Sequence, residues 1–213
     1  MTRLEEFQEL LERSRYREAL HLVDQALQSN DPDEPFERMA AALRNRAESS
    51  HDATNAIYEA MYRAAIDLQR RAHGEDSEAV WTAWWCLAAF LDKHADSHAA
   101  KGAYRSMIAV AEKLVDSEPA LLERALNRYA ELIMRQGELA EAELLQRQVI
   151  ASLEKDWPGR EAREGRFGKK GPSLPDALSD LRANLLMQGK ADEANDVAAR
   201  IAEVRSAEDG TDD

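Results

Sequence analysis

The stretch LNRYAELIMRQGELAEAELLQRQVI, residues 126–150, contains two amphipathic patterns separated by a glycine. On each side of Gly137, apolar residues recur every three or four positions, which is the spacing of one face of an α-helix. Glycine often ends a helix because it adopts the left-handed conformation without steric strain. We therefore expect a helical hairpin, with Ser117 as the N-cap of its first helix and Pro119 in the first turn. The two apolar stripes are formed by Leu122, Leu126, Tyr129, Ala130 and Ile133, and by Leu139, Ala142, Leu145, Val149 and Leu153.

Elements of this hairpin recur along the chain at an interval of 42 residues. The interval separates Tyr62 from Tyr104 and Trp84 from Leu126. It also separates the expected helix starts Pro35, Ser77 and Pro119. A period near 40 residues indicates stacked supersecondary units, each unable to bury its apolar face alone. Glycine (9) and proline (6) are scarce and helix-forming residues dominate, so we expect an all-α protein with short connections.

Residues 126–150 resemble a tetratricopeptide repeat (TPR). The positions that carry the resemblance are Leu126, Tyr129, Ala130, Gly137, Leu139, Glu141, Ala142 and Val149. The small residues Ala130 and Ala142 let paired helices approach closely. The 42-residue period is similar to that of kinesin light chains and their bacterial relatives. The resemblance covers nearly the whole chain and implies an all-α, TPR-like right-handed superhelix, an α-solenoid of about five helical hairpins.

We expect a single repeat domain over residues 1–206, followed by a disordered acidic tail at 207–213. The second unit departs most from the TPR pattern, because Arg46 and Tyr58 occupy its two small-residue positions. Arg182 occupies one such position in the last unit. The five units are expected at about residues 2–30, 35–73, 77–116, 119–155 and 175–206.

The segment 156–174 interrupts the period and is expected to be an exposed loop. Residues 155–170 carry six Lys/Arg and three Asp/Glu, a net charge of +3 in a chain whose net charge is −13. Its spacing does not match a phosphate-binding loop. Three interpretations stay open: a solvated insertion, a segment docked on the protein's own acidic groove, and a site for an acidic partner. The basic residues in question are Arg160, Arg163, Arg166, Lys169 and Lys170.

No motif for catalysis, for a cofactor or for a metal stands in the sequence. The single cysteine, Cys86, lies among apolar residues and is expected to be inert. His94 and His98 are four residues apart, but the repeat phase places them across a turn, so we expect exposed turn residues. The acidic balance disfavours nucleic acid as a general partner, because negative charge repels phosphate backbones. Without a signal peptide or a long apolar run, we expect a cytoplasmic protein that does not enter membranes.

TPR relatives commonly bind extended peptides or helices on the concave face lined by the first helix of each hairpin. The resemblance places Asn127 where kinesin-light-chain-like repeats have an asparagine that clamps the peptide backbone. The alternative is a solvated helix face with local ion pairs. The predicted partner-binding residues are Trp85, Asp92 and Lys93, with Thr82 and Ala89 beside them, and Arg124, Asn127, Arg128, Glu131 and Arg135. Ser179, Asp180 and Ala183 occupy this face in the last unit and are less informative.

Residues 79–90, AVWTAWWCLAAF, contain three of the four tryptophans. At about 100° per residue, Trp84 falls at the centre of the apolar stripe and is predicted to lie in the core. Trp81 is expected on the flank, between successive units. Trp85 is expected on the concave side, as a contact anchor or as a cover over the neighbouring helix.

These patterns predict a non-catalytic interaction module or adaptor that binds a peptide or helix of a partner protein. Acidic groups of the partner would meet Arg124, Arg128 and Arg135. One alternative is a self-assembling homodimeric scaffold or regulatory subunit. Another is contact with an anion or a nucleic acid through the basic loop, residues 160–170.

Overall fold

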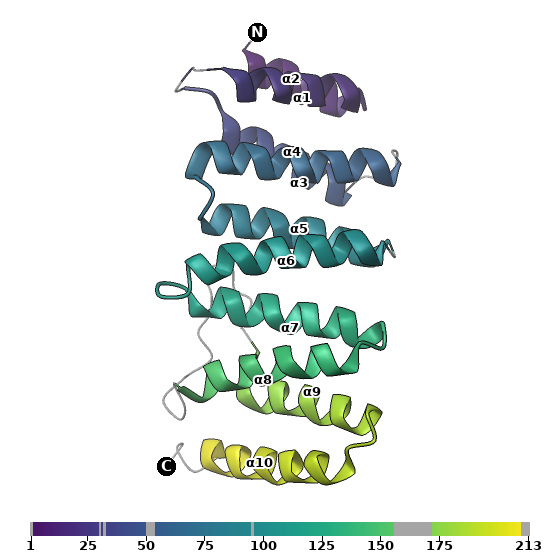
Figure 1. The fold of residues 1–213 in the computed structure, drawn as a ribbon. Coiled ribbons are helices and arrows are strands. Elements are labelled where there is room, and N and C mark those ends of the chain that lie inside the picture. Colours follow the sequence, from purple (N-terminus) through teal and green to yellow (C-terminus); the bar gives the residue numbers. More distant parts are fainter. Residues whose placement is uncertain are drawn as a thin grey trace. The chain divides into compact units, whose positions relative to one another are not determined.

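The computed structural model describes residues 2–29, 31, 33–49, 54–94, 96–155 and 172–209. Within these ranges the secondary structure is entirely helical (Figure 1). The helices are α1 (Arg3–Glu12), α2 (Tyr16–Gln28), α3 (Phe36–Ser49), α4 (Asn55–His73), α5 (Glu78–Lys93), α6 (Ser97–Lys113), α7 (Pro119–Arg135), α8 (Leu139–Lys155), α9 (Leu174–Met187) and α10 (Ala191–Asp209).

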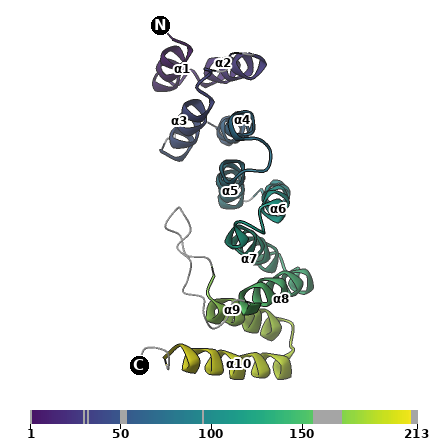
Figure 2. The same ribbon diagram turned by 90° about the vertical axis from the view of Figure 1, so that its left-hand side faces the viewer.

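Consecutive helices pack as the hairpins α1–α2, α3–α4, α5–α6, α7–α8 and α9–α10 (Figure 2). The prediction of an all-α protein built from about five helical hairpins is confirmed. The chain divides into two compact units, residues 1–113 with α1–α6 and residues 114–213 with α7–α10. The single domain expected over residues 1–206 stays a prediction. In the part of the chain that the structure describes, no helix is both long and apolar enough to span a membrane.

Glycines end helices as expected. Gly137 has φ +82° and Gly189 has φ +75°, the left-handed region that glycine adopts readily. The amide of Gly137 donates to the carbonyl of Met134 and that of Glu138 to the carbonyl of Ile133, both at 3.0 Å. This pair of bonds is the Schellman motif, and it satisfies carbonyls that the end of α7 would leave open.

The predicted start of α7 is partly wrong. Pro119 is its first residue, as expected, but the N-cap is Glu118, without a side-chain capping bond. The hydroxyl of Ser117 donates instead to the carbonyl of Leu114 at 3.1 Å, because the chain turns back on Leu114 at this point. At α5 and α9 the serines Ser77 and Ser173 do cap, accepting bonds from Val80 and Asp176.

The core of the first unit corrects the predicted order of the tryptophans. Trp81 is only 2% exposed and is among the largest fully buried side chains, whereas Trp84 is half-buried. Helix α5 packs against both α4 and α6, so its buried surface is wider than one stripe and includes Trp81. The ring of Trp84 lies at the edge, with the guanidinium of Arg70 at 5.6 Å. Trp81 therefore lies in the core, where Trp84 was expected.

The irregular second hairpin uses its large side chains to contact its neighbours. Arg46 donates to the hydroxyl of Tyr16 from Nε and a terminal nitrogen, at 3.0 and 2.8 Å. Tyr58 is buried and meets the ring of Phe90 edge-on, with centroids 6.4 Å apart. Tyr62 also packs against Phe90, at 5.2 Å. The departures from the small-residue pattern therefore become specific contacts between hairpins.

The second unit has a core of its own, which includes Leu126, Tyr129, Ile133, Val149 and Leu185. Helix α10 continues to Asp209, three residues into the segment for which disorder is expected, and residues 210–213 lie outside the described part.

Candidate functional site

The first helices of the second unit, α7 and α9, share a polar surface that we call the α7–α9 face. It comprises Asn127, Arg128 and Glu131 of α7 and Ser179 and Asp180 of α9. The amide of Asn127 donates to one carboxylate oxygen of Glu131 at 3.0 Å, and the guanidinium of Arg128 binds the other at 2.8 Å. Three of the predicted partner-binding residues thus form one hydrogen-bonded group.

Asp180 completes the α7–α9 face. Partial burial raises the pKa of its carboxyl group, and the neighbouring carboxylates of Glu131 and Asp176 raise it further, while Arg128 opposes the shift. The influence of Glu131 and Arg128 on this pKa indicates that Asp180 lies near the α7 group. The sequence placed Asp180 on this face but did not reveal its neighbours, because the long segment before α9 hides the alignment of the two helices.

The other arginines of α7 differ in accessibility. Arg124 is only 8% exposed, so it cannot reach a partner without rearrangement. Its neighbour Glu123 is 2% exposed and accepts a hydrogen bond from the hydroxyl of Ser152 at 2.8 Å. Arg135 is exposed at the end of the helix. Of the three arginines predicted to meet acidic groups, the structure leaves Arg128 and Arg135 at the surface.

The first unit carries a second surface, which we call the α3–α5 face. It comprises Arg44 and Glu48 of α3 and Thr82, Trp85, Cys86 and Ala89 of α5. Trp85 is half-buried and packs on Trp81, with ring centroids 5.3 Å apart and planes at 33°. Ala89 beside it is exposed. Of the remaining predicted residues, Asp92 is half-buried and Lys93 is exposed at the end of α5.

Cys86 lies beside Arg44 and Glu48 of α3. Burial raises the pKa of its thiol, and hydrogen bonding and charge from Arg44 only partly offset the rise. A thiol with a raised pKa is largely protonated at neutral pH and is a poor nucleophile. The environment therefore favours the predicted inert role.

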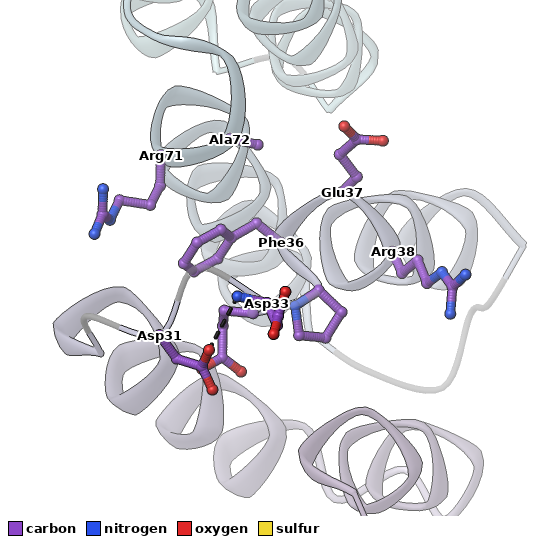
Figure 3. Close-up of a pocket in the computed structure, with 9 residues that line it drawn as sticks. Asp31, Asp33, Phe36, Glu37, Arg38, Arg71 and Ala72 are labelled. Atoms are coloured by element: carbon purple, nitrogen blue, oxygen red, sulfur yellow. Dashed lines mark hydrogen bonds between the residues drawn. The ribbon is translucent and has the colours of Figure 1, made fainter.

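A pocket of about 700 Å³ lies between the α2–α3 connection, the start of α3 and the end of α4 (Figure 3). No motif in the sequence marks it. Two of its carboxylates bind residues outside the lining: Glu34 forms an ion pair with Arg3, and Glu37 contacts His73 at 3.2 Å. The guanidinium of Arg71 lies over the ring of Phe36 at 5.7 Å. The lining residues are Asp31, Asp33, Glu34, Pro35, Phe36, Glu37, Arg38, Arg71 and Ala72.

Among the described residues, no group of His, Cys, Asp and Glu is placed to hold a metal ion. His94 is the C-cap residue of α5, and its ring packs on Phe90 at 4.5 Å. His98 lies in the first turn of α6 and is exposed. The two histidines flank the turn between two helices, where the sequence placed them. The predicted basic-loop residues Arg160, Arg163, Arg166, Lys169 and Lys170 lie outside the described residues.

No protein-family model matches the sequence, and no curated protein matches it. Solved structures do. A point variant of the nearly identical, kinesin-light-chain-like TPR repeats of Podosopora anserina aligns with a TM-score of 0.63 and 15% identity over 97% of this chain and 94% of that one. The unsubstituted repeats align with a TM-score of 0.61, at 15% identity over 96% and 94%. BtubC (BKLC) from P. vanneervenii aligns with a TM-score of 0.60, at 18% identity over 96% of this chain and 75% of that one.

Similarity at this level of identity establishes the fold. The chain has the TPR-like repeat fold of kinesin-light-chain-type proteins, as its 42-residue period predicted. That fold generally serves as a scaffold for protein interactions, and many different partners use it.

Proposed function

We propose that this protein is a non-catalytic interaction module that binds a peptide or helix of a partner protein on the first helices of its hairpins. Each unit offers a face of its own: the α3–α5 face of the first unit would supply an aromatic anchor, and the α7–α9 face of the second would supply hydrogen bonds and charge. Rigid helices hold both sets of side chains, which lowers the entropy lost when a partner binds.

The observation that carries the proposal is the position of Trp85. Its indole is half-buried, is supported from behind by the buried ring of Trp81, and has the small, exposed Ala89 as its neighbour. A large aromatic side chain held in place beside an open position is typical of the anchor residues that dominate binding energy.

The α7–α9 face supports the same function with different chemistry. Arg128 presents a guanidinium group that suits carboxylates, as does Arg135 at the nearby end of α7, while Glu131 and Asp180 suit cations and amides. Arg128 already binds Glu131, so an acidic partner group would join or replace that ion pair. We expect this face to select among partners more than it adds to affinity.

The experiment combines site-specific crosslinking with substitution. A photo-crosslinking amino acid at Ala89 should capture the partner, and the same group at the exposed Gln148 of α8 should not. The double variant Trp85→Ala/Asn127→Ala should lower recovery of that partner at least about tenfold, given the weight of anchor residues. The control variant Glu112→Ala/Gln148→Ala changes two exposed positions on second helices and should bind normally. Equal recovery by both double variants would exclude each face as a binding site.

A further inference from the structure

The last hairpin is joined to the rest of its unit differently from the hairpins of the first unit. Helix α8 ends at Lys155 and α9 begins at Leu174, so residues 156–173 connect them, 18 residues in all. Helices α4 and α5 are joined by only four residues, 74–77. Among the described residues, side-chain packing and polar contacts hold α9–α10 against α8.

A buried amide pair provides one part of these contacts. Asn184 of α9 is fully buried, and its amide donates to the side-chain oxygen of Gln146 at 2.8 Å and to the carbonyl of Leu139 at 3.0 Å. Gln146 is 2% exposed. Neither side chain can exchange these bonds for water while the helices stay together, so the pair fixes the register of α9 on α8.

A charged cluster provides the other part, and we call it the Glu143 latch. One carboxylate oxygen of Glu143 accepts bonds from the ammonium of Lys190 at 2.6 Å and the amide of Gln188 at 2.9 Å. The other accepts from Nε of Arg147 at 2.9 Å, and Arg147 reaches on to Glu193 of α10 at 2.9 Å. Three of the five side chains, Gln188, Lys190 and Glu193, belong to the α9–α10 hairpin or its turn.

The latch contributes to the attachment of α9–α10 because its central carboxylate is largely buried. Glu143 is 9% exposed, and bonds from Lys190, then Arg147 and Gln188, hold its pKa well below the ordinary value. A charge in this position depends on its partners, since losing one leaves an uncompensated buried ion. Ionic bonds of this kind also weaken when salt screens the more exposed partner, here Lys190 with 38% of its side chain accessible.

We propose that α9–α10 is a separable hairpin that opens from α8 as one unit, and that this opening becomes more frequent when the Glu143–Lys190 pair of the latch is screened or removed. Opening would also carry Asp180 of α9 away from Glu131 of α7. Any effect of this on partner binding rests on the proposed function, but the opening itself does not.

Hydrogen exchange of the full chain, followed by mass spectrometry, tests the proposal without a partner. In Glu143→Gln, amides of α9 and α10 should exchange at least about tenfold faster, while those of α3–α5 and α7 stay as in the wild type. Raising the salt from about 50 mM to about 1 M should speed exchange of the same two helices in the wild type and have little effect in Glu143→Gln. The matched control is Glu154→Gln, because Glu154 also meets the hairpin, through Arg200 at 3.6 Å, but both side chains are more than 40% exposed.

Two results would overturn the latch. One is exchange in α9–α10 that does not respond to salt in the wild type, which needs no substitution and so cannot be confused with misfolding. The other is faster exchange in α7 and α8 to the same extent as in α9 and α10, which would mean that unit 2 opens as a whole. Lys190→Gln removes the charge from the other side and should reproduce the effect of Glu143→Gln.

Discussion

At the scale of single residues, the structure separates side chains that a helical wheel treats alike. Trp81, Trp84 and Trp85 lie within one helix, yet one is buried, one packs beneath an arginine at the edge and one lies on the α3–α5 face. A wheel predicts the direction of a side chain, but the number of neighbouring helices decides how much of the wheel is buried. Trp85 could be singled out from the sequence, whereas the exchange of roles between Trp81 and Trp84 could not.

Trp81→Ala should therefore destabilise the protein by about 3–5 kcal/mol, because it leaves a large cavity in a closed core. Trp84→Ala should cost about 1–2 kcal/mol, since only part of its surface is buried and the contact with Arg70 adds little. Urea denaturation followed by circular dichroism measures both. Equal losses for the two variants would contradict the assignment of Trp81 to the core.

Glu143 gives stability a defined pH dependence. Its pKa falls from an ordinary 4.5 to about 2 in the folded protein, chiefly through the bond from Lys190. The unfolded chain binds the proton more tightly, so the contribution of Glu143 is complete above pH about 4.5 and is lost as the pH falls toward about 2. The free energy of unfolding should decrease across this window by about 1–3 kcal/mol more in the wild type than in Glu143→Gln. Parallel curves for the two proteins would show that Glu143 is not selectively stabilised as an anion.

At the scale of elements, the sequence predicted most of the structure. The apolar spacing and Gly137 defined the α7–α8 hairpin, and the 42-residue interval extended it to the rest of the chain. Two kinds of detail could not be predicted. Capping depends on the local path of the chain, and for this reason the N-cap of α7 is Glu118 and not the expected Ser117. The polar contacts of Asn184 and Glu143 join residues about 40 positions apart, and no local pattern marks such pairs.

Two glycines test the role of backbone conformation at this scale. Gly137→Ala should destabilise by about 1–2 kcal/mol because φ is +82°, although the added Cβ has no neighbour within 4 Å. Gly102 lies inside α6 with equally open surroundings and without a positive φ, so Gly102→Ala should stabilise by up to about 1 kcal/mol. Thermal unfolding of the two variants should shift in opposite directions. A shift in the same direction for both would contradict the conformational explanation.

At the scale of the whole molecule, the first and last hairpins have polar exposed residues. Exposed positions of α2 include Arg17, Glu18, Asp24 and Gln25, and those of α10 include Asp192, Asn195 and Asp196. Repeat arrays need such capping surfaces to stay soluble. These surfaces disfavour the homodimeric alternative, at least through the ends of the array.

We therefore expect light scattering after gel filtration to give the mass of one chain, 23.9 kDa, at all concentrations up to about 100 µM, in the range where weak self-association becomes visible. A mass that rises with concentration would favour self-assembly. Disappearance of that rise in Leu186→Ser/Met187→Ser, which removes two exposed apolar side chains, would locate the contact near the α9–α10 turn.

The contacts between neighbouring hairpins also protect the order in which the hairpins stack. Each contact uses different chemistry: Arg46 with Tyr16, Tyr62 with Phe90, and Asn184 with Gln146. Repeats of nearly identical sequence can slip by one unit during folding, or exchange between chains, because every partner fits equally well. Here a slipped arrangement would leave Asn184 without its acceptor and Arg46 without its hydroxyl, at the cost of unpaired buried polar groups. The irregular residues that weaken the repeat pattern in the sequence thus favour pairing of each hairpin with its correct neighbour during folding.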